Sequence, residues 1–252
     1  MSSSPFSLVG KAAIVTGANT GIGQAIAVAL AEVGADVALA GRSPAEETAE
    51  QIRALGRGAV PIAADLGTTE PVGRVVEEAL AAFGRLDILV NNAGIIRRAE
   101  AVDFSEADWD AVIDTNLKSL FFLCQAAGRH MLGQRSGKIV NIASLLSFQG
   151  GIRVPSYAAA KSGVAGLTKA LANEWAGRGV NVNAIAPGYI ATNNTAALQA
   201  DETRNRQIIE RIPAGRWGDP KDIAGAAVFL ASSAADYVNG HVLAVDGGWL
   251  GR

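Results

Sequence analysis

Short apolar runs alternate along the chain with longer stretches in which apolar positions recur at helical spacing. Seven of these runs, rich in Val, Ile, Ala and Leu, are strand candidates: residues 12–16, 36–40, 60–64, 87–91, 138–142, 182–186 and 242–246. Their nearly continuous hydrophobicity is typical of parallel strands that are buried on both faces. The pattern predicts an α/β fold in which a doubly wound, seven-stranded, mostly parallel sheet carries helices on both faces.

The size of the chain indicates one domain. Its 252 residues suit a single α/β domain, and a hydrophobic content of 49% is enough for a sheet buried on two sides. Since no internal repeat or linker interrupts the pattern, we predict a single domain over residues 1–252. Residues 192–216 are polar and fit no strand or helix pattern, and long loops in compact domains commonly cover a site. We therefore expect a substrate loop region at about residues 192–216.

The charge pattern gives no sign of a nucleic-acid or membrane partner. The net charge is −2, and the sequence has no dense run of Lys or Arg. The first residues lack a basic leader followed by an apolar core, and no apolar run approaches membrane-spanning length. We therefore expect a cytoplasmic protein that binds neither nucleic acid nor a membrane.

Cysteine and histidine are too scarce to indicate a metal site. Cys124 is the only cysteine, which excludes an internal disulfide and favours a buried thiol, and His130 and His241 are the only histidines. We therefore expect no Cys/His metal site.

A glycine-rich loop directly follows the first predicted strand. Gly17, Gly21 and Gly23 let the backbone turn tightly, approach a pyrophosphate and pack the next helix on the sheet, with the helix N-terminus facing the anion. Glycines also serve ordinary turns. Their place between a strand and an alanine-rich helix nevertheless favours a dinucleotide site.

The end of the second predicted strand indicates which dinucleotide is bound. An acidic residue here would bind the adenosine ribose, whereas an arginine can pair with a 2′-phosphate. This chain has Gly41 and Arg42, which favours NADP(H). NAD(H) stays open, because a single solvated arginine is also common at protein surfaces.

Polar residues near the ends of later strands are further candidates. Asp65 can accept a hydrogen bond from the adenine amino group and Leu66 can pack on the ring, although a turn aspartate fits the same spacing. Residues 91–94, NNAG, allow a ligand to approach the backbone closely. Asn116 interrupts a helix that Ser105 is expected to cap, so its amide is either bonded to neighbouring backbone or functional.

Residues 144–161 hold the strongest candidate chemistry. Ser144 follows an apolar strand, and Pro155 marks a helix start after which Tyr157 and Lys161 lie four residues apart on one face. A phenol titrates near ~10, so proton exchange near neutrality needs a cation such as Lys161 that favours the phenolate. An ordinary amphipathic helix would space Tyr and Lys in the same way. Together with the glycine loop, the segment predicts the catalytic part of an oxidoreductase.

Four motifs together resemble the short-chain dehydrogenase/reductase family over nearly the whole chain: TGANTGIG, NNAG, YAAAK and PGYIAT. The resemblance implies a Rossmann-type fold with catalytic roles for Asn116, Ser144, Tyr157 and Lys161. In the family, Tyr exchanges a proton with the substrate oxygen, Ser hydrogen-bonds that oxygen, Lys contacts the nicotinamide ribose and tunes the Tyr, and Asn helps to hold a water. The cofactor contacts expected for this chain are Gly17, Asn19, Thr20, Gly21, Ile22, Gly23, Arg42, Asp65, Leu66, Asn92, Ala93, Gly94, Tyr157, Lys161, Pro187, Gly188, Ile190 and Thr192.

Five segments are similar to a branch of this family that acts on small sugar acids: GIIRRAEA, SLLSFQGGIRVPSY, PGYIATNNT, RIPAGRWG and DYVNGHVLAVDGGWL. This similarity implies hydride transfer between NAD(P)(H) and a secondary alcohol or ketone of a 2-dehydro-3-deoxy-D-gluconate or gluconate type of substrate. A carboxylate needs a cation, and amides can meet hydroxyls. The candidate substrate residues are Arg98, Ser144, Gln149, Arg153 and Asn193, with Arg97 and Asn194 as neighbouring alternatives.

Two other functions remain open from the sequence. A 3-oxoacyl-carrier-protein reductase, or another ketone reductase of the family, would have an apolar channel and a basic docking surface. A cofactor-binding regulator would keep the glycine loop, but it would not need Ser144, Tyr157 and Lys161. The resemblance also implies a homotetramer, as is usual in the family.

Overall fold

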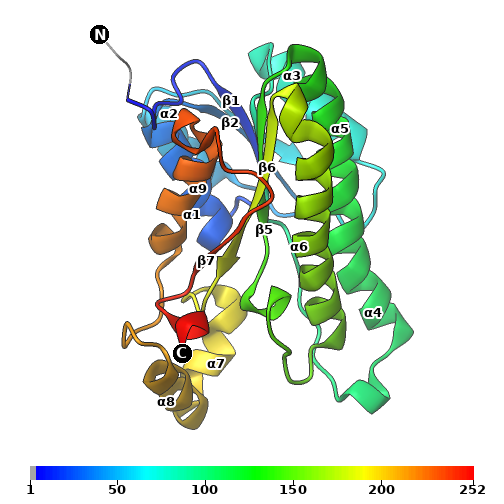
Figure 1. Ribbon diagram of the computed structural model, residues 1–252, viewed down its shortest axis with the longest axis vertical. Coiled ribbons are helices and arrows are strands. Elements are labelled where there is room, and N and C mark those ends of the chain that lie inside the picture. Colours follow the sequence, from blue (N-terminus) through cyan, green and yellow to red (C-terminus); the bar gives the residue numbers. More distant parts are fainter. Residues whose placement is uncertain (1–3) are drawn as a thin grey trace.

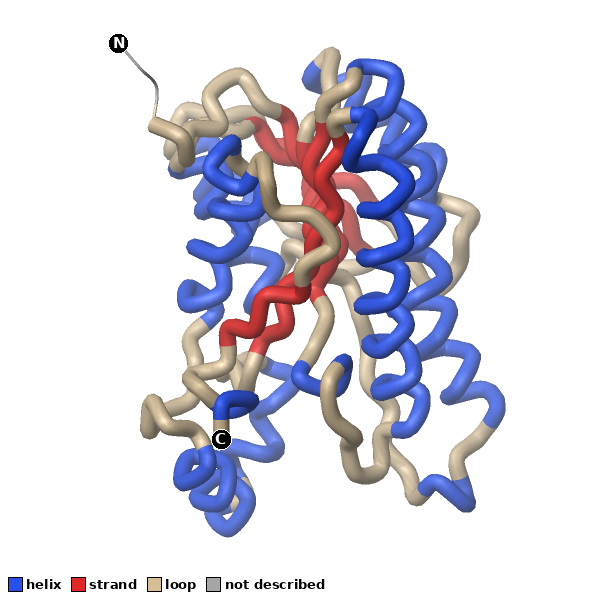
Figure 2. The backbone as a smooth tube through the Cα atoms, viewed as in Figure 1, coloured by secondary structure: helices blue, strands red, loops and turns tan. Residues whose placement is uncertain are grey.

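One sheet of seven strands runs through the middle of the molecule in a computed structural model that describes residues 4–252 (Figure 2). Every neighbouring pair of strands is parallel, and the spatial order is β3-β2-β1-β4-β5-β6-β7. The strands are β1 (Ala12–Thr16), β2 (Asp36–Gly41), β3 (Ala59–Ala63), β4 (Ile88–Asn91), β5 (Gly137–Ile142), β6 (Val180–Pro187) and β7 (Val242–Val245). Each lies within two residues of its predicted position, and the predicted fold class is confirmed.

Helices cover both faces of this sheet (Figure 1). One layer contains α1 (Gly21–Glu32), α2 (Glu46–Ala54) and α9 (Pro220–Ala231), and the other contains α3 (Val72–Phe83), α5 (Ser119–Gln134) and α6 (Pro155–Trp175). Because successive side chains of a strand point to opposite faces, Ala13 and Val15 of β1 pack in the first layer and Ile14 packs in the second. The sheet therefore separates two hydrophobic cores.

A long helical run is interrupted where Asn116 predicted a break. Ser105 caps α4 (Glu106–Ile113) by accepting a hydrogen bond from the backbone N–H of Asp108, as its position at the helix start predicts. A π-helical turn, Asp114–Lys118, then separates α4 from α5. Turns of this kind are frequent at functional sites, so Asn116 stays a candidate site residue.

The predicted loop at residues 192–216 is largely helical, and that prediction needs correction. It contains α7 (Ala196–Ala200) and α8 (Glu202–Arg211), which lie beyond the carboxyl ends of the strands (Figure 1). Asp201 starts α8 by accepting hydrogen bonds from the backbone N–H groups of Thr203 and Arg204. Only Ile208 is buried in α8, so the apolar pattern of this helix is too weak to be recognised.

Candidate active site

The glycine loop directly follows β1, next to the point between β1 and β4 where the order of the strands reverses. Gly17 and Gly21 have φ values of 63° and 59°, which disfavour residues with a Cβ. A Cβ on Gly23 would overlap the carbonyl oxygen of Gly17. Thr20, at the start of α1, forms no side-chain cap among residues 4–252, so the first N–H groups of this helix are available to an anion.

The NNAG segment is hydrogen-bonded to the start of the glycine loop. The Asn92 amide donates hydrogen bonds of 3.0 Å to the carbonyl oxygens of Thr16 and Gly17. The Thr16 hydroxyl accepts 3.0 Å bonds from the backbone N–H groups of Asn92 and Ala93. Asn92 therefore holds the loop in shape. The sequence analysis missed Thr16, whose signal was a hydroxyl at the end of a fully apolar strand.

Arg42 lies exposed just after β2, at the same edge of the sheet. A Cβ on the preceding Gly41 would be 3.8 Å from the Gly17 Cα, which places this corner beside the glycine loop. Arg42 has no ion pair or side-chain hydrogen bond within residues 4–252. Its guanidinium is therefore available to a phosphate at this edge.

Asp65 and Leu66 both have structural partners. The Asp65 carboxylate accepts a 3.0 Å bond from the backbone N–H of Gly67, so it forms the turn that the sequence left open. Leu66 is buried in the core of the second layer. Their contacts with an adenine ring stay predictions. With the glycine cradle, the open start of α1 and Arg42, the residues at this edge fit a phosphate-bearing dinucleotide.

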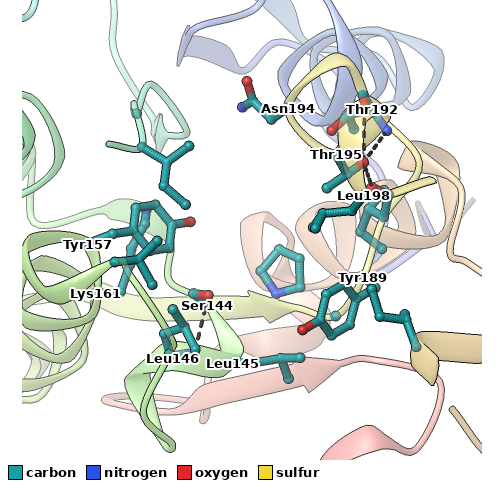
Figure 3. A pocket seen from close by; sticks show the side chains of 18 of the residues that line it. Ser144, Leu145, Leu146, Tyr157, Lys161, Tyr189, Thr192, Asn194, Thr195 and Leu198 are labelled. Carbon is teal, nitrogen blue, oxygen red and sulfur yellow. Dashed lines mark hydrogen bonds between the residues drawn. The ribbon is translucent and has the colours of Figure 1, made fainter. Parts of the chain in front are cut away.

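Ser144, Tyr157 and Lys161 come together at the carboxyl end of β5 (Figure 3). Ser144 starts a short 3₁₀ helix, Leu145–Ser147, and its hydroxyl accepts a 3.2 Å bond from the backbone N–H of Leu146. Lys161 is only 3% exposed, and its Nζ donates a 2.6 Å bond to the carbonyl oxygen of Ile142. The same Nζ lies 5.6 Å from the centre of the Tyr157 ring.

The pKa values of Tyr157 and Lys161 shift in directions that the sequence did not predict. Burial raises the pKa of the Tyr157 phenol above its ordinary value, although the nearby Ser144 hydroxyl and the Arg98 charge act to lower it. Burial also lowers the pKa of Lys161 to about 8. The expected lowering of the Tyr157 pKa by Lys161 is therefore not found in the protein alone, because desolvation dominates both groups.

Replacing Lys161 by Met is expected to stabilise the fold by about 1–2 kcal/mol at pH 7, because a buried ammonium is costly. The gain should shrink as the pH rises from 8 toward 10.5, since the folded wild type then releases the proton that the unfolded chain still holds. Urea unfolding of both proteins at pH 7 and pH 9.5 measures this difference. A variant that is less stable than wild type at both pH values would contradict the expectation.

Asn116 is fully buried, and its side chain is bonded to the backbone of one residue. Its Nδ2 donates to the Ile95 carbonyl oxygen and its Oδ1 accepts from the Ile95 N–H, both at 2.8 Å. The π-helical turn and the strand-end segment that follows NNAG are thereby joined. The side chain is satisfied by backbone, so a catalytic role must come from another part of this residue and stays a prediction.

A cavity of about 600 Å³ opens in front of the catalytic group. The lining contains three arginines and four amide side chains but no Asp or Glu: Arg98, Arg204, Arg211, Asn92, Gln149, Asn194 and Gln207. Such a cavity favours an anionic, hydroxyl-bearing ligand, because an unpaired cation attracts a carboxylate.

The predicted substrate residues divide between the cavity and the surface. Arg98, Ser144 and Gln149 line the cavity, as do the cofactor candidates Ile22, Asn92, Gly94, Pro187, Gly188, Ile190 and Thr192. Arg153 instead pairs with Glu100 at 3.2 Å, and Arg97 pairs with Asp108 at 3.1 Å. Asn194 lies in the lining where the sequence analysis favoured Asn193. Arg153 and Asn193 therefore lie outside the cavity lining, and their contact with the substrate stays a prediction.

Arg204, Gln207 and Arg211 of α8 were missed, together with Trp249 after β7. Arg204, Gln207 and Arg211 recur at helical spacing, which could have indicated a shared helix face. This spacing was not used because the segment was expected to be a loop. Among residues 4–252, no cluster of three or more His, Cys, Asp or Glu side chains could hold a metal ion. No helix in this part of the chain is both long and apolar enough to cross a membrane.

Comparison with known proteins decides the family. A family described as enoyl-(acyl carrier protein) reductase matches residues 17–250. The 2-dehydro-3-deoxy-D-gluconate 5-dehydrogenase of Escherichia coli K12 is 58% identical over 250 residues, covering 99% of both chains. The chain belongs to the short-chain dehydrogenase/reductase family. The predicted enzyme class, an NAD(P)-dependent oxidoreductase of this family, is confirmed.

Two solved structures of this family carry the cofactor that Arg42 predicts. A protein from Agrobacterium tumefaciens, provisionally assigned as a 2-deoxy-D-gluconate 3-dehydrogenase, contains NADP; it is 62% identical and covers 98% of this chain and 99% of its own, with a TM-score of 0.92. A gluconate 5-dehydrogenase from Burkholderia cenocepacia, in complex with NADP and tartrate, is 40% identical and covers 98% of both chains, with a TM-score of 0.93.

Proposed function

We propose that this short-chain dehydrogenase/reductase interconverts a secondary alcohol and a ketone on a small sugar acid of the 2-dehydro-3-deoxy-D-gluconate or gluconate type, with NADP(H). One observation carries the proposal. A single cavity joins Ser144, Tyr157 and Lys161 to three arginines and four amide side chains, without an acidic side chain. The names of the E. coli and B. cenocepacia relatives support the same class of substrate.

The residues of the chain divide the chemistry of this reaction between them. When bound beside the glycine loop, the nicotinamide cofactor would supply the hydride for ketone reduction and would accept it in alcohol oxidation. Tyr157 Oη gives a proton to the substrate oxygen during reduction and takes it back during oxidation. The Ser144 hydroxyl donates a hydrogen bond to the same oxygen and so orients it. The Lys161 ammonium favours the phenolate that remains on Tyr157.

The proposal also assigns roles to the glycine loop, Arg42 and Asn116. Gly17, Gly21 and Gly23 give the pyrophosphate a close approach to the backbone, and Arg42 pairs with the 2′-phosphate. Asn116 fixes the segment after NNAG through Ile95, and we propose that its backbone rather than its side chain meets a relay water. A homotetramer and a cytoplasmic location remain predictions, the former consistent with the half-exposed strand β7 at the edge of the sheet.

Initial rates on a small panel test this function. Purified protein is assayed with 2-dehydro-3-deoxy-D-gluconate, its hydroxy-acid product, gluconate and an acetoacetyl thioester, each with NADPH or NADP⁺ and with NADH or NAD⁺. We expect activity confined to the sugar acids. Activity on the thioester alone would favour the 3-oxoacyl-carrier-protein reductase alternative, and cofactor binding without turnover would favour a regulator.

Replacing Arg42 by Ala is expected to raise the KM for NADPH by about 10- to 30-fold, because a charge-assisted contact with the 2′-phosphate is lost. The KM for NADH should change less than about 2-fold, since NADH has no phosphate at this position. Initial rates at a saturating sugar acid measure both constants. An equal change for the two cofactors would contradict the assignment of Arg42.

A further inference from the structure

One face of α8 is turned toward the cavity. Arg204, Gln207, Ile208 and Arg211 recur at intervals of three and four residues, and all four line the cavity. Asp201 fixes the start of the helix, and the buried Ile208 packs beneath it. This helix therefore presents charged groups to the substrate from a defined position, although it was expected to be a loop.

Arg211 stacks on an aromatic ring, which distinguishes it from Arg98 and Arg204 among the described residues. Its guanidinium carbon lies 4.0 Å from the centre of the Trp249 ring, a stacked arrangement that leaves the N–H edge of the guanidinium free. Among residues 4–252, Arg211 has no ion pair and no side-chain hydrogen bond. By contrast, Arg204 donates a 2.8 Å hydrogen bond to the side-chain oxygen Oε1 of Gln207 on the same helix.

Trp249 connects Arg211 to the catalytic segment. It is 4% exposed, and its Nε1 donates a 3.3 Å bond to the Gln149 side-chain oxygen, in the loop that follows Ser144. The indole belongs to a small hydrophobic cluster with Leu145 and Ile208. Since Leu145 directly follows Ser144, the position of Arg211 is linked to that of the catalytic hydroxyl through one rigid ring.

Arg98 lines the same cavity from the segment that follows β4, whereas Arg211 lines it from α8. The charge of Arg98 acts to lower the pKa of the Tyr157 phenol, against the effect of burial. In an open-chain sugar acid, a hydroxyl toward the far end lies several carbons from the carboxylate. A carboxylate therefore needs a second cation, away from Tyr157, and α8 carries the cations that meet this need.

We propose that Arg211 binds the carboxylate of the substrate and that Trp249, tied to Gln149, is the positioning residue that holds Arg211 in place. This inference rests on the proposed function, because it assumes an acidic substrate. It adds that the enzyme distinguishes a sugar acid from an uncharged analogue mainly through Arg211, and that Arg98 serves the reacting end.

The test compares an acid with its amide in several variants. The substrate is whichever of 2-dehydro-3-deoxy-D-gluconate and gluconate gives the higher kcat/KM, and the analogue is its carboxamide. Arg211→Met keeps an apolar chain on the indole without the charge, and Arg211→Lys keeps the charge without the planar stack. Arg206→Met is the matched control, since Arg206 lies on the same helix within 4.0 Å of Glu210 and outside the cavity lining.

Arg211→Met should raise the KM for the acid by about 10- to 100-fold, with little change in kcat, and should leave kcat/KM for the amide within about 2-fold. Arg211→Lys should recover part of the affinity, and Arg206→Met should resemble wild type. Trp249→Phe keeps a ring under Arg211 but loses the bond to Gln149. It should raise the KM for the acid by about 3- to 10-fold and change the amide little.

Binding of the acid to the NADPH-loaded protein, measured by calorimetry, gives the same comparison without turnover. Equal losses for acid and amide in Arg211→Met, or an Arg206→Met variant that loses as much as Arg211→Met, would overturn the inference and leave the proposed function standing. A wild type that binds the acid through Arg211 but does not oxidise or reduce it would instead overturn the proposed function alone. A wild type that neither binds nor turns over sugar acids would overturn both.

Discussion

Tyr157→Phe is expected to lower kcat by about 10³-fold while it leaves the affinity for NADPH nearly unchanged. Burial raises the pKa of the Tyr157 phenol, so the phenol is protonated at neutral pH and can donate to a ketone oxygen. Phenylalanine fills the same space but has no proton to give. Single-turnover reduction of the sugar-acid ketone, followed through NADPH absorbance, measures the chemical step directly.

The control for this variant is Tyr237→Phe, because Tyr237 is fully exposed and outside the cavity lining. It should keep wild-type kcat and KM. NADPH binding, measured by fluorescence titration, should agree among the wild type and both variants. If Tyr157→Phe retains more than about a tenth of the wild-type kcat, another group carries the proton and the assigned mechanism is wrong.

Gly23→Ala is expected to weaken NADPH binding by more than about 100-fold, because the glycine loop cannot keep its shape with a methyl group at this position. The added Cβ would overlap the Gly17 carbonyl oxygen and press on the Asn92 amide, which bonds that same oxygen. Neither neighbour can move without opening the turn. Calorimetric titration with NADPH measures the loss.

Gly133→Ala is the matched control for a methyl group added to a helical glycine. Gly133 lies in α5, and a Cβ there meets nothing within 4 Å, so the variant should bind NADPH like the wild type and be equally or slightly more stable. Circular dichroism of both variants separates a local effect on the loop from unfolding. Normal NADPH binding by a folded Gly23→Ala protein would refute the cradle described for this loop.

The sheet was predictable because its strands carry their signal locally. Each is a short apolar run, and the central strands are buried on both faces. The runs at β1 and β4 lead into small or turn-forming residues that mark the cofactor edge. The pair Tyr157 and Lys161 was found in the same way, since a helix places residues four apart on one face. These features depend on neighbours in the sequence.

The substrate side of the cavity depends on distant neighbours and could not be predicted in the same way. Nothing near Arg211 in the sequence shows that it stacks on Trp249, and nothing near Arg153 shows that it forms an ion pair with Glu100. The direction of the Tyr157 pKa shift also depends on how deeply the folded chain buries the ring. Sequence spacing identified Lys161 as the partner of the Tyr157 phenol, but it could not show that the phenol is desolvated.

The separation of the interior into two cores has a consequence for engineering. The core on the side of α1, α2 and α9 and the core that includes α6 meet only through the backbone of the sheet, so substitutions in one should add to substitutions in the other with little coupling. Tyr157 and Lys161 stand on α6. Cavity-filling changes around α2 and the far end of α9 can therefore accumulate thermal tolerance without shifting the geometry on which turnover depends.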